Sequence, residues 1–137
     1  MAKIETKNIR NIALLGHGGS GKTTLAEAML YIAGASDRFG KVSDGNTVMD
    51  FDAEEKRRHN SVSSAVCPLE WRDKKINIID TPGLFDFAGG VSEALSAADS
   101  VIVTISGKSG LTVGAKQSFE KARAAGKAVG FFVGKLN

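Results

Sequence analysis

The fold is decided by a nine-residue stretch, Gly16-His17-Gly18-Gly19-Ser20-Gly21-Lys22-Thr23-Thr24. An apolar run at residues 12–15 precedes it, and residues 25–31 after it have the composition of a helix. The stretch contains the complete pattern G-x-x-x-x-G-K-[ST], whose glycines let backbone N–H groups curl around phosphate oxygens. A flexible glycine turn is the alternative for the pattern alone. The strand before it and the helix after it are the context that a phosphate-binding loop requires, so we interpret it as one.

This loop predicts a site for a nucleoside triphosphate and magnesium. We assign Lys22 both a binding and a catalytic role, because a lysine at this place reaches the β- and γ-phosphates. The hydroxyl of Thr23 is the expected ligand of Mg²⁺. The first turn of the following helix adds unpaired N–H groups and the positive end of its dipole. The other loop residues predicted to contact the nucleotide are His17, Gly18, Gly19, Ser20, Gly21 and Thr24.

A second motif, Asp80-Thr81-Pro82-Gly83, follows an apolar strand at residues 76–79. Ligands of parallel α/β sheets bind at the carboxyl ends of the strands. There Asp80 can hold magnesium, usually through a water, and the N–H of Gly83 can sense the γ-phosphate, which gives this glycine a catalytic role. The same four residues also make a good turn, which is the alternative when the motif is taken alone.

The rest of the chain alternates strand and helix patterns. Strands are predicted at residues 9–15, 65–71, 75–79, 101–106 and 128–133, and helices at residues 22–33, 91–98 and 112–125. This order predicts one domain over residues 1–137, an α/β fold of the P-loop nucleoside triphosphatase type with a mostly parallel sheet and one antiparallel edge strand. The polar stretch at about residues 35–64 is interpreted as a first switch and residues 80–88 as a second, both ordering around a γ-phosphate.

Composition and charge fit a globular domain and exclude some other classes. The chain has 42% hydrophobic and 24% charged residues, and its net charge of +3 permits a nucleic-acid-rich partner without pointing to one. No direct DNA binding is expected. Cys67 is the only cysteine, so a reducing cytoplasm is the expected location. No apolar run is long enough for a membrane span, so no membrane partner is expected.

Three segments together resemble the start of elongation factor G, and more narrowly the divergent elongation-factor-G-like branch of the translational GTPases. They are residues 11–17 with 21–24, residues 44–51, and residues 76–83 with Asp86 and Phe87, and the resemblance runs from about residue 8 to the last residue. It implies a GTPase domain that takes GTP, GDP and Mg²⁺ and has the ribosome as its partner. Family members are much longer, so the chain is expected to be the N-terminal part of one. The sheet would then stop after its fifth strand, and residues 128–133 would form an open edge.

Departures from the family concern hydrolysis and magnesium. The family has a histidine directly after Asp-Thr-Pro-Gly, which helps to position the attacking water, and this chain has Leu84. Impaired intrinsic hydrolysis is therefore expected. In the first switch, Ser61 stands where the family has a threonine that ligates magnesium, so it is the expected third metal ligand, with an ordinary loop serine as the alternative. Gly19 replaces an aspartate of the family's loop.

The base-reading motif of the family, Asn-Lys-x-Asp, is replaced by Gly134-Lys135-Leu136-Asn137. Lys135 can still lie over the base. Asn137 offers one acceptor oxygen where an aspartate offers two, and its amide adds donors. We therefore expect Lys135 and Asn137 to contact the base and to discriminate guanine from adenine only weakly.

Two other function classes stay open. A nucleotide-binding switch with little or no hydrolysis is favoured by Leu84. A deviant P-loop ATPase of the partition or septum-site type matches residues 18–23, but its signature lysine is replaced by His17 and the long polar loop does not suit it.

Overall fold

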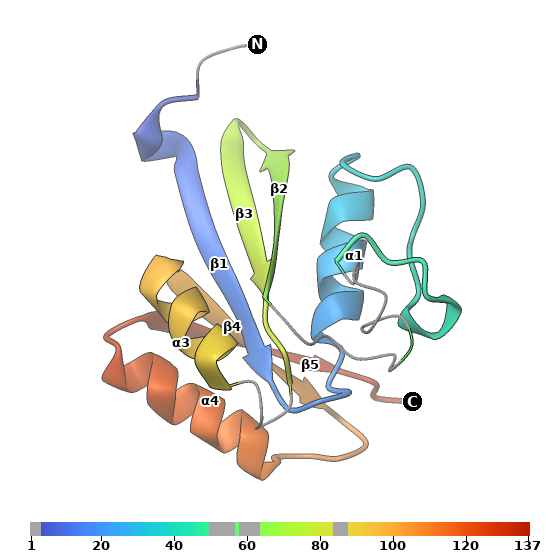
Figure 1. Cartoon of the computed structure of the whole chain (residues 1–137), viewed down its shortest axis with the longest axis vertical. Helices are drawn as coiled ribbons and strands as arrows, with labels where there is room; N and C mark the ends of the chain where they lie inside the picture. The colour runs from blue at the N-terminus through green and yellow to red at the C-terminus, as the bar shows by residue number, and fades with distance from the viewer. Residues whose placement is uncertain (1–3, 50–56, 58–63, 84–87) are drawn as a thin grey trace.

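The structure is a computed structural model that describes residues 4–49, 57, 64–83 and 88–137. It confirms the predicted α/β fold, with η denoting short 3₁₀ turns (Figure 1). The elements in chain order are η1 (Thr6–Asn8), β1 (Ile9–Gly16), α1 (Lys22–Ile32), η2 (Val42–Asp44), β2 (Ala65–Trp71), β3 (Lys74–Asp80), α3 (Ala88–Ala97), β4 (Ser100–Ser106), α4 (Val113–Ala124) and β5 (Ala128–Gly134).

The predicted element bounds are right to within three residues. The largest difference is the start of α3, predicted at residue 91 and found at Ala88. Gly89 and Gly90 lie in its first turn, and glycine is a poor helix former, so sequence reasoning placed the start too late. Helix α4 begins after Thr112, whose side chain accepts a hydrogen bond from Ala115 N and so caps the helix.

The sheet has the order β2-β3-β1-β4-β5. Strands β3, β1, β4 and β5 are parallel, while β2 pairs antiparallel with β3 at one edge, as predicted. Leu14 of β1 lies opposite Asp80 of β3 on one side and Ile102 of β4 on the other. The carboxyl ends of the three central strands therefore meet at one end of the sheet.

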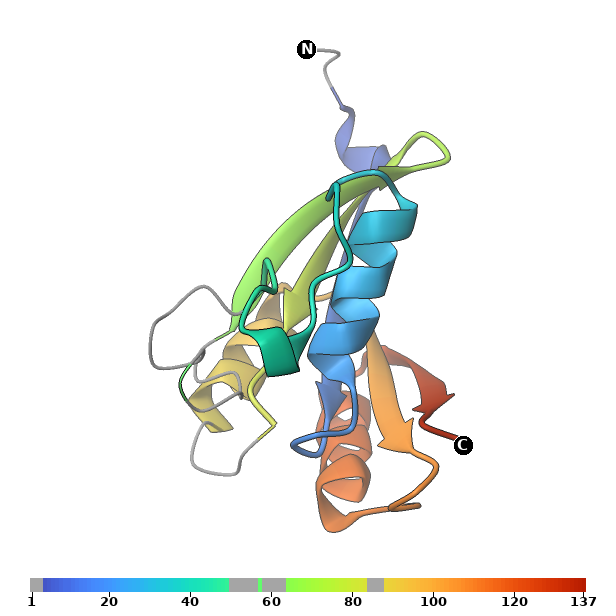
Figure 2. The ribbon, with the colours of Figure 1, turned by 90° about the vertical axis from the view of Figure 1, so that its right-hand side faces the viewer.

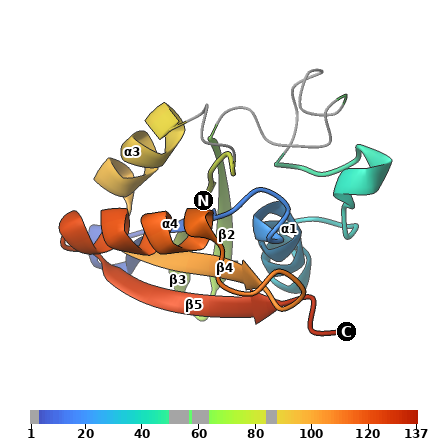
Figure 3. The same ribbon diagram turned by 90° about the horizontal axis from the view of Figure 1, so that it is seen from below.

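Helices cover both faces of the sheet, with α1 on one side and α3 and α4 on the other (Figure 3). Successive residues of β1 point to opposite faces, so Leu14 enters the core under α1 while Ala13 and Leu15 enter the core under the other two helices. All three are fully buried. This explains the unbroken apolar run before the phosphate-binding loop.

The first part of the long polar stretch is folded against α1. Residues 35–49 run beside this helix and include the short turn η2 (Figure 2). The Asn46 side chain accepts a hydrogen bond from Lys41 N (2.7 Å), and Met49 is buried in the core under α1. The remaining parts of the two predicted switches, residues 50–56, 58–63 and 84–87, lie outside the described residues, and with them Ser61 and Leu84.

Strand β5 forms the other edge of the sheet, as expected. It exposes Phe131 (56%), Phe132 (40%) and Val133 (47%), although the ring of Phe131 also packs on Phe119 of α4 with 5.6 Å between centroids. Among the described residues, no helix is long and apolar enough to cross a lipid bilayer.

The central position of β1 predicts a large stability effect at Leu14. Leu14→Ala is expected to lower the free energy of unfolding by about 3 kcal/mol, because it leaves a cavity between the sheet and α1. The matched control is Leu111→Ala, where the side chain is 73% exposed and a change within about 0.5 kcal/mol is expected. Urea denaturation of both variants measures the difference, and equal losses would contradict this account of the core.

Candidate phosphate-binding site

The predicted phosphate-binding loop joins the end of β1 to the start of α1. Its glycines Gly16, Gly19 and Gly21 have φ angles of 143°, 76° and 104°, a region that other residues rarely adopt. Space is also limiting, since a Cβ on Gly16 would lie 2.6 Å from Thr104 O. Gly21 stands at the N-cap of α1 and has no side chain to cap it, so the amides of the first turn stay available to an anion.

Lys22 lies inside this loop rather than in solvent. It is 5% exposed, and its ammonium group donates to Gly16 O (3.1 Å) and His17 O (2.9 Å). Burial lowers the pKa of Lys22 from its usual 10.5 to about 8, because desolvation disfavours the charged form, while the nearby carboxylate of Asp80 acts in the opposite direction. Two backbone carbonyls of the loop thus hold the Lys22 ammonium.

The two predicted magnesium ligands of the described part of the chain are in contact. Thr23 Oγ1 donates to Asp80 Oδ2 at 2.6 Å, although 57 residues separate them. Asp80 is the last residue of β3 and is 1% exposed. A hydroxyl and a carboxylate are hard oxygen ligands of the kind that Mg²⁺ takes, with phosphate oxygens and waters completing its shell. The donor set therefore fits a magnesium ion, and the described residues hold no cluster of three or more histidine, cysteine or acidic side chains that would suggest another metal.

Gly83 lies directly against the loop. A Cβ at this position would come within 2.6 Å of Gly18 N and of the Lys22 ammonium, so any other residue would displace one of them. The strand end that carries this motif is fixed by Thr81, whose hydroxyl donates to Leu14 O at 2.6 Å. Asp80 and Gly83 thus reach the loop from the same turn.

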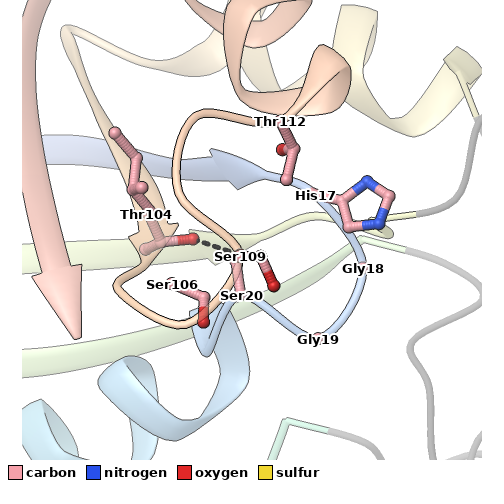
Figure 4. A pocket seen from close by; sticks show the side chains of 9 residues that line it. His17, Gly18, Gly19, Ser20, Thr104, Ser106, Ser109 and Thr112 are labelled. Carbon is pink, nitrogen blue, oxygen red and sulfur yellow. Dashed lines mark hydrogen bonds between the residues drawn. The ribbon is translucent and has the colours of Figure 1, made fainter. Parts of the chain in front are cut away.

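A pair of buried hydroxyls ties the loop to β4. The hydroxyls of Ser20 and Thr104 are hydrogen-bonded at 2.6 Å, and Thr104 Oγ1 also donates to Leu15 O at 3.2 Å (Figure 4). Sequence reasoning missed Thr104. The available signal was a threonine inside the apolar run at residues 101–106, where a buried hydroxyl needs a partner.

A small hollow of about 20 Å³ lies between the loop and the connection from β4 to α4, lined by His17, Ser20, Ser106, Ser109 and Thr112 among others (Figure 4). This volume suffices for about one water molecule, so the hollow is not the space for a nucleotide. The His17 ring faces α4, where a Cβ on Gly114 would lie 3.0 Å from His17 Nδ1. Only the backbone of His17 is therefore directed to the predicted phosphate site.

Of the other residues predicted to contact the nucleotide, the structure brings only some to the loop. Thr24 is exposed in the first turn of α1, two residues after the buried Lys22. The Lys135 ammonium donates to Gly19 O at 2.6 Å, which joins the altered base motif to the phosphate-binding loop across 116 residues. Asn137 is exposed two residues further on. Ser61 and Leu84 are not among the residues that the structure describes.

Comparison with known proteins gives a family match over nearly the whole chain. The sequence pattern of the family described as "Elongation factor Tu GTP binding domain" matches residues 7–137. Among curated proteins, the mitochondrial ribosome-releasing factor 2 of Schizosaccharomyces pombe is 36% identical over 136 residues, which is 99% of this chain and 17% of that protein. Elongation factor G of Gluconobacter oxydans is 43% identical over 110 residues, which is 80% of this chain and 16% of that protein.

Solved structures agree with these matches. A crystal structure of a protein from Thermus thermophilus superimposes with a TM-score of 0.90 at 41% identity, over 93% of this chain and 19% of that one. The bacterial selenocysteine-specific elongation factor superimposes with a TM-score of 0.70 at 21% identity, over 90% of this chain and 19% of that one, which shows a shared fold. The chain spans less than a fifth of the length of each of these four proteins.

The pKa of Lys22 predicts a pH dependence of nucleotide binding. Bound phosphates favour the protonated lysine, so affinity is highest below pH 8 and falls as the free lysine loses its proton. We expect the affinity for a non-hydrolysable triphosphate to fall roughly tenfold between pH 7 and pH 9. The Lys22→Met variant should bind weakly and show no such fall, and a wild-type affinity that does not change with pH would contradict the assignment. Titration with a fluorescent triphosphate nucleotide measures both.

Proposed function

Because the chain belongs to the elongation factor Tu GTP-binding domain family, we propose that it is the GTP-binding and GTP-hydrolysing switch domain of an elongation factor G-like protein. Its resemblance to elongation factor G is confirmed by the relatives of that name. The observation that carries the proposal is the meeting of three groups at one loop, the Lys22 ammonium, the Thr23–Asp80 pair and the Gly83 backbone.

The roles we propose rest on this geometry, and for Ser61 on its place in the sequence alone. The loop amides and Lys22 bind the phosphates, and Lys22 stabilises charge that develops on them during hydrolysis. Thr23 and Asp80, with Ser61 as a further ligand, hold Mg²⁺, which neutralises charge on the phosphates when it is bound. The N–H of Gly83 contacts the γ-phosphate, so the second switch responds to its presence.

We propose the ribosome as partner and the cytoplasm as location. Relatives that share the family are named as elongation factor G and ribosome-releasing factor 2, and the net charge of +3 suits a surface rich in nucleic acid. Some of these relatives are mitochondrial. The deviant P-loop ATPase does not agree with the family match, which extends over residues 7–137 and is to a GTP-binding domain.

A second candidate function is a nucleotide-dependent switch with little hydrolysis. It is favoured by Leu84, which stands where elongation factor G has its water-positioning histidine. An apolar side chain neither accepts nor donates the hydrogen bond that orients the attacking water. Nucleotide binding does not depend on that side chain, so the protein would bind nucleotide but hydrolyse it slowly.

The affinities for GTP, GDP and ATP, measured with Mg²⁺ by calorimetry, test the binding part of the proposal. GTP and GDP should bind. Lys22→Ala should lower the affinity for GTP at least about a hundredfold, because it removes a charged contact to the phosphates. Circular dichroism checks that the variant stays folded. An affinity for GTP that survives this change would exclude the loop as the site.

The residues Gly134 and Asn137 lead to a separate expectation, which concerns the selectivity for guanine over adenine. We expect the affinities for GTP and ATP to differ by less than about tenfold. The double change Gly134→Asn with Asn137→Asp should raise the preference for guanine by roughly tenfold, which is the value of one or two added hydrogen bonds. A strong preference for GTP in the unmodified chain would mean that other residues read the base.

Single-turnover hydrolysis separates the two candidate functions. We expect very slow GTP hydrolysis by the protein alone. If ribosomes accelerate it, the chain is a GTPase, and Leu84→His should accelerate it further only in their presence, because the side chain must be oriented by the partner. If ribosomes leave the rate unchanged, the switch without hydrolysis is the better account.

A further inference from the structure

Thr104 is a threonine inside the apolar strand β4, and it lies directly opposite the first residue of the phosphate-binding loop. The strand register pairs it with Gly16 of β1, and its side chain is fully buried. Removing a hydroxyl group from water is unfavourable unless hydrogen bonds replace the lost hydration. The partners of Thr104 therefore indicate its role.

Those partners lie at the two ends of the loop. Thr104 Oγ1 donates to Leu15 O at 3.2 Å, directly before the loop, and it lies 2.6 Å from Ser20 Oγ, directly before the N-cap of α1 (Figure 4). Ser20 is 4% exposed, so the contact between the two hydroxyls is shielded from water. One side chain of β4 thus ties the beginning of the loop to its end.

The direction of these hydrogen bonds follows from the number of protons. A hydroxyl carries one proton, and that of Thr104 is donated to Leu15 O, so Ser20 is the donor in the contact between the two hydroxyls. The N–H of Ser20 is also engaged, since it donates to His17 O at 3.1 Å. Both donors of Ser20 are therefore used inside the protein, and neither is left for a phosphate.

The same segment of the loop holds Lys22. The lysine ammonium donates to Gly16 O and His17 O, and His17 O is the carbonyl that also accepts from Ser20 N. Gly16 lies close to the hydroxyl pair, because a Cβ on it would come within 2.7 Å of Thr104 Oγ1 and 3.0 Å of Ser20 Oγ. Both carbonyls that hold the lysine therefore belong to the segment that the hydroxyl pair closes.

We propose that Thr104 is a positioning residue for nucleotide binding, and that Ser20 acts through it rather than as a ligand of the phosphates. The hydroxyl pair fixes the curvature of the loop before the nucleotide arrives, so the loop amides and Lys22 lose little freedom on binding. Thr104 is fully buried, so it acts through the backbone and the serine that it holds. This inference rests on the function proposed above.

A double-mutant cycle tests whether Ser20 acts through Thr104. The affinities for GDP and for a non-hydrolysable GTP analogue are measured with Mg²⁺ by calorimetry. Thr104→Val should lower both affinities about fivefold, the value of one hydrogen bond, because the loop amides hold the phosphates that the two nucleotides share. Ser20→Ala should lower them by a similar factor in the wild type, but by less than about twofold in the Thr104→Val background.

Two control variants separate positioning from stability. Thr104→Ser keeps the hydroxyl and should keep both affinities within about twofold of the wild type. Val101→Ala removes a buried side chain of the same strand from the core under α3 and α4. It should lower the free energy of unfolding and leave both affinities unchanged, because it does not touch the loop. Urea denaturation gives the stability of each variant.

Hydrogen exchange at the amide of residue 20 gives a second measurement. Without nucleotide, this amide should exchange faster in Thr104→Val and in Ser20→Ala than in Thr104→Ser, because the turn that it closes loses its tie to β4. Where Thr104→Val does not fold, Ser20→Ala decides. A lower affinity with faster exchange supports the inference, and a lower affinity with unchanged exchange would show that the serine hydroxyl contacts a phosphate directly.

The outcomes separate this inference from the function on which it rests. An equal loss on Ser20→Ala in both backgrounds would show a direct contact to the phosphates, and unchanged affinities in Thr104→Val or, where that variant does not fold, in Ser20→Ala would show that the hydroxyl pair only stabilises the fold. Either result would overturn the inference while the nucleotide site stands. A wild-type protein that binds neither nucleotide would overturn the proposed function, and this inference with it.

Discussion

The pairing of β1 between two parallel strands is the constraint on which the rest of the structure depends. A strand in this place is buried on both faces, and it ends within two residues of the ends of both neighbours. Because Leu14 lies opposite Asp80 and Ile102, the loop after β1 opens between the ends of β3 and β4. Asp80 and the buried Thr104 therefore reach the loop from opposite sides.

Buried polar contacts then hold the loop in a shape that suits phosphate. The hydroxyls of Thr81 and Thr104 bind the carbonyls of Leu14 and Leu15, and Ser20 binds Thr104 in turn. These contacts fix backbone that glycine would otherwise leave free to move. A site whose donors are already oriented loses little entropy when an anion arrives, which is the usual basis of strong phosphate binding and of charge stabilisation in a transition state.

The long polar stretch is not uniform. Its first part, to Met49, is folded onto α1 through the buried carboxyl group of Glu27, although its composition is that of a solvated loop. Glu27, Arg38 and Asn46 hold it through backbone groups, and the Phe39 ring packs on Tyr31 of α1 with 6.2 Å between centroids. A neighbouring element can order a polar stretch in this way, although the sequence of the stretch itself gives no sign of that element's contacts.

The sequence alone determined the fold class and the order of the strands and helices, and it predicted the phosphate-binding loop. These follow from local rules, since apolar runs, helix patterns and glycine spacing are each readable within a dozen residues. The tertiary structure decided which distant residues meet, namely Thr23 with Asp80, Lys135 with Gly19, and Glu27 with Met49. Glu27 has no local signal beyond its place among core positions of α1, and Thr104 only a hydroxyl in an apolar strand. Contacts across 22 to 116 residues depend on strand register and helix packing, which no local pattern specifies.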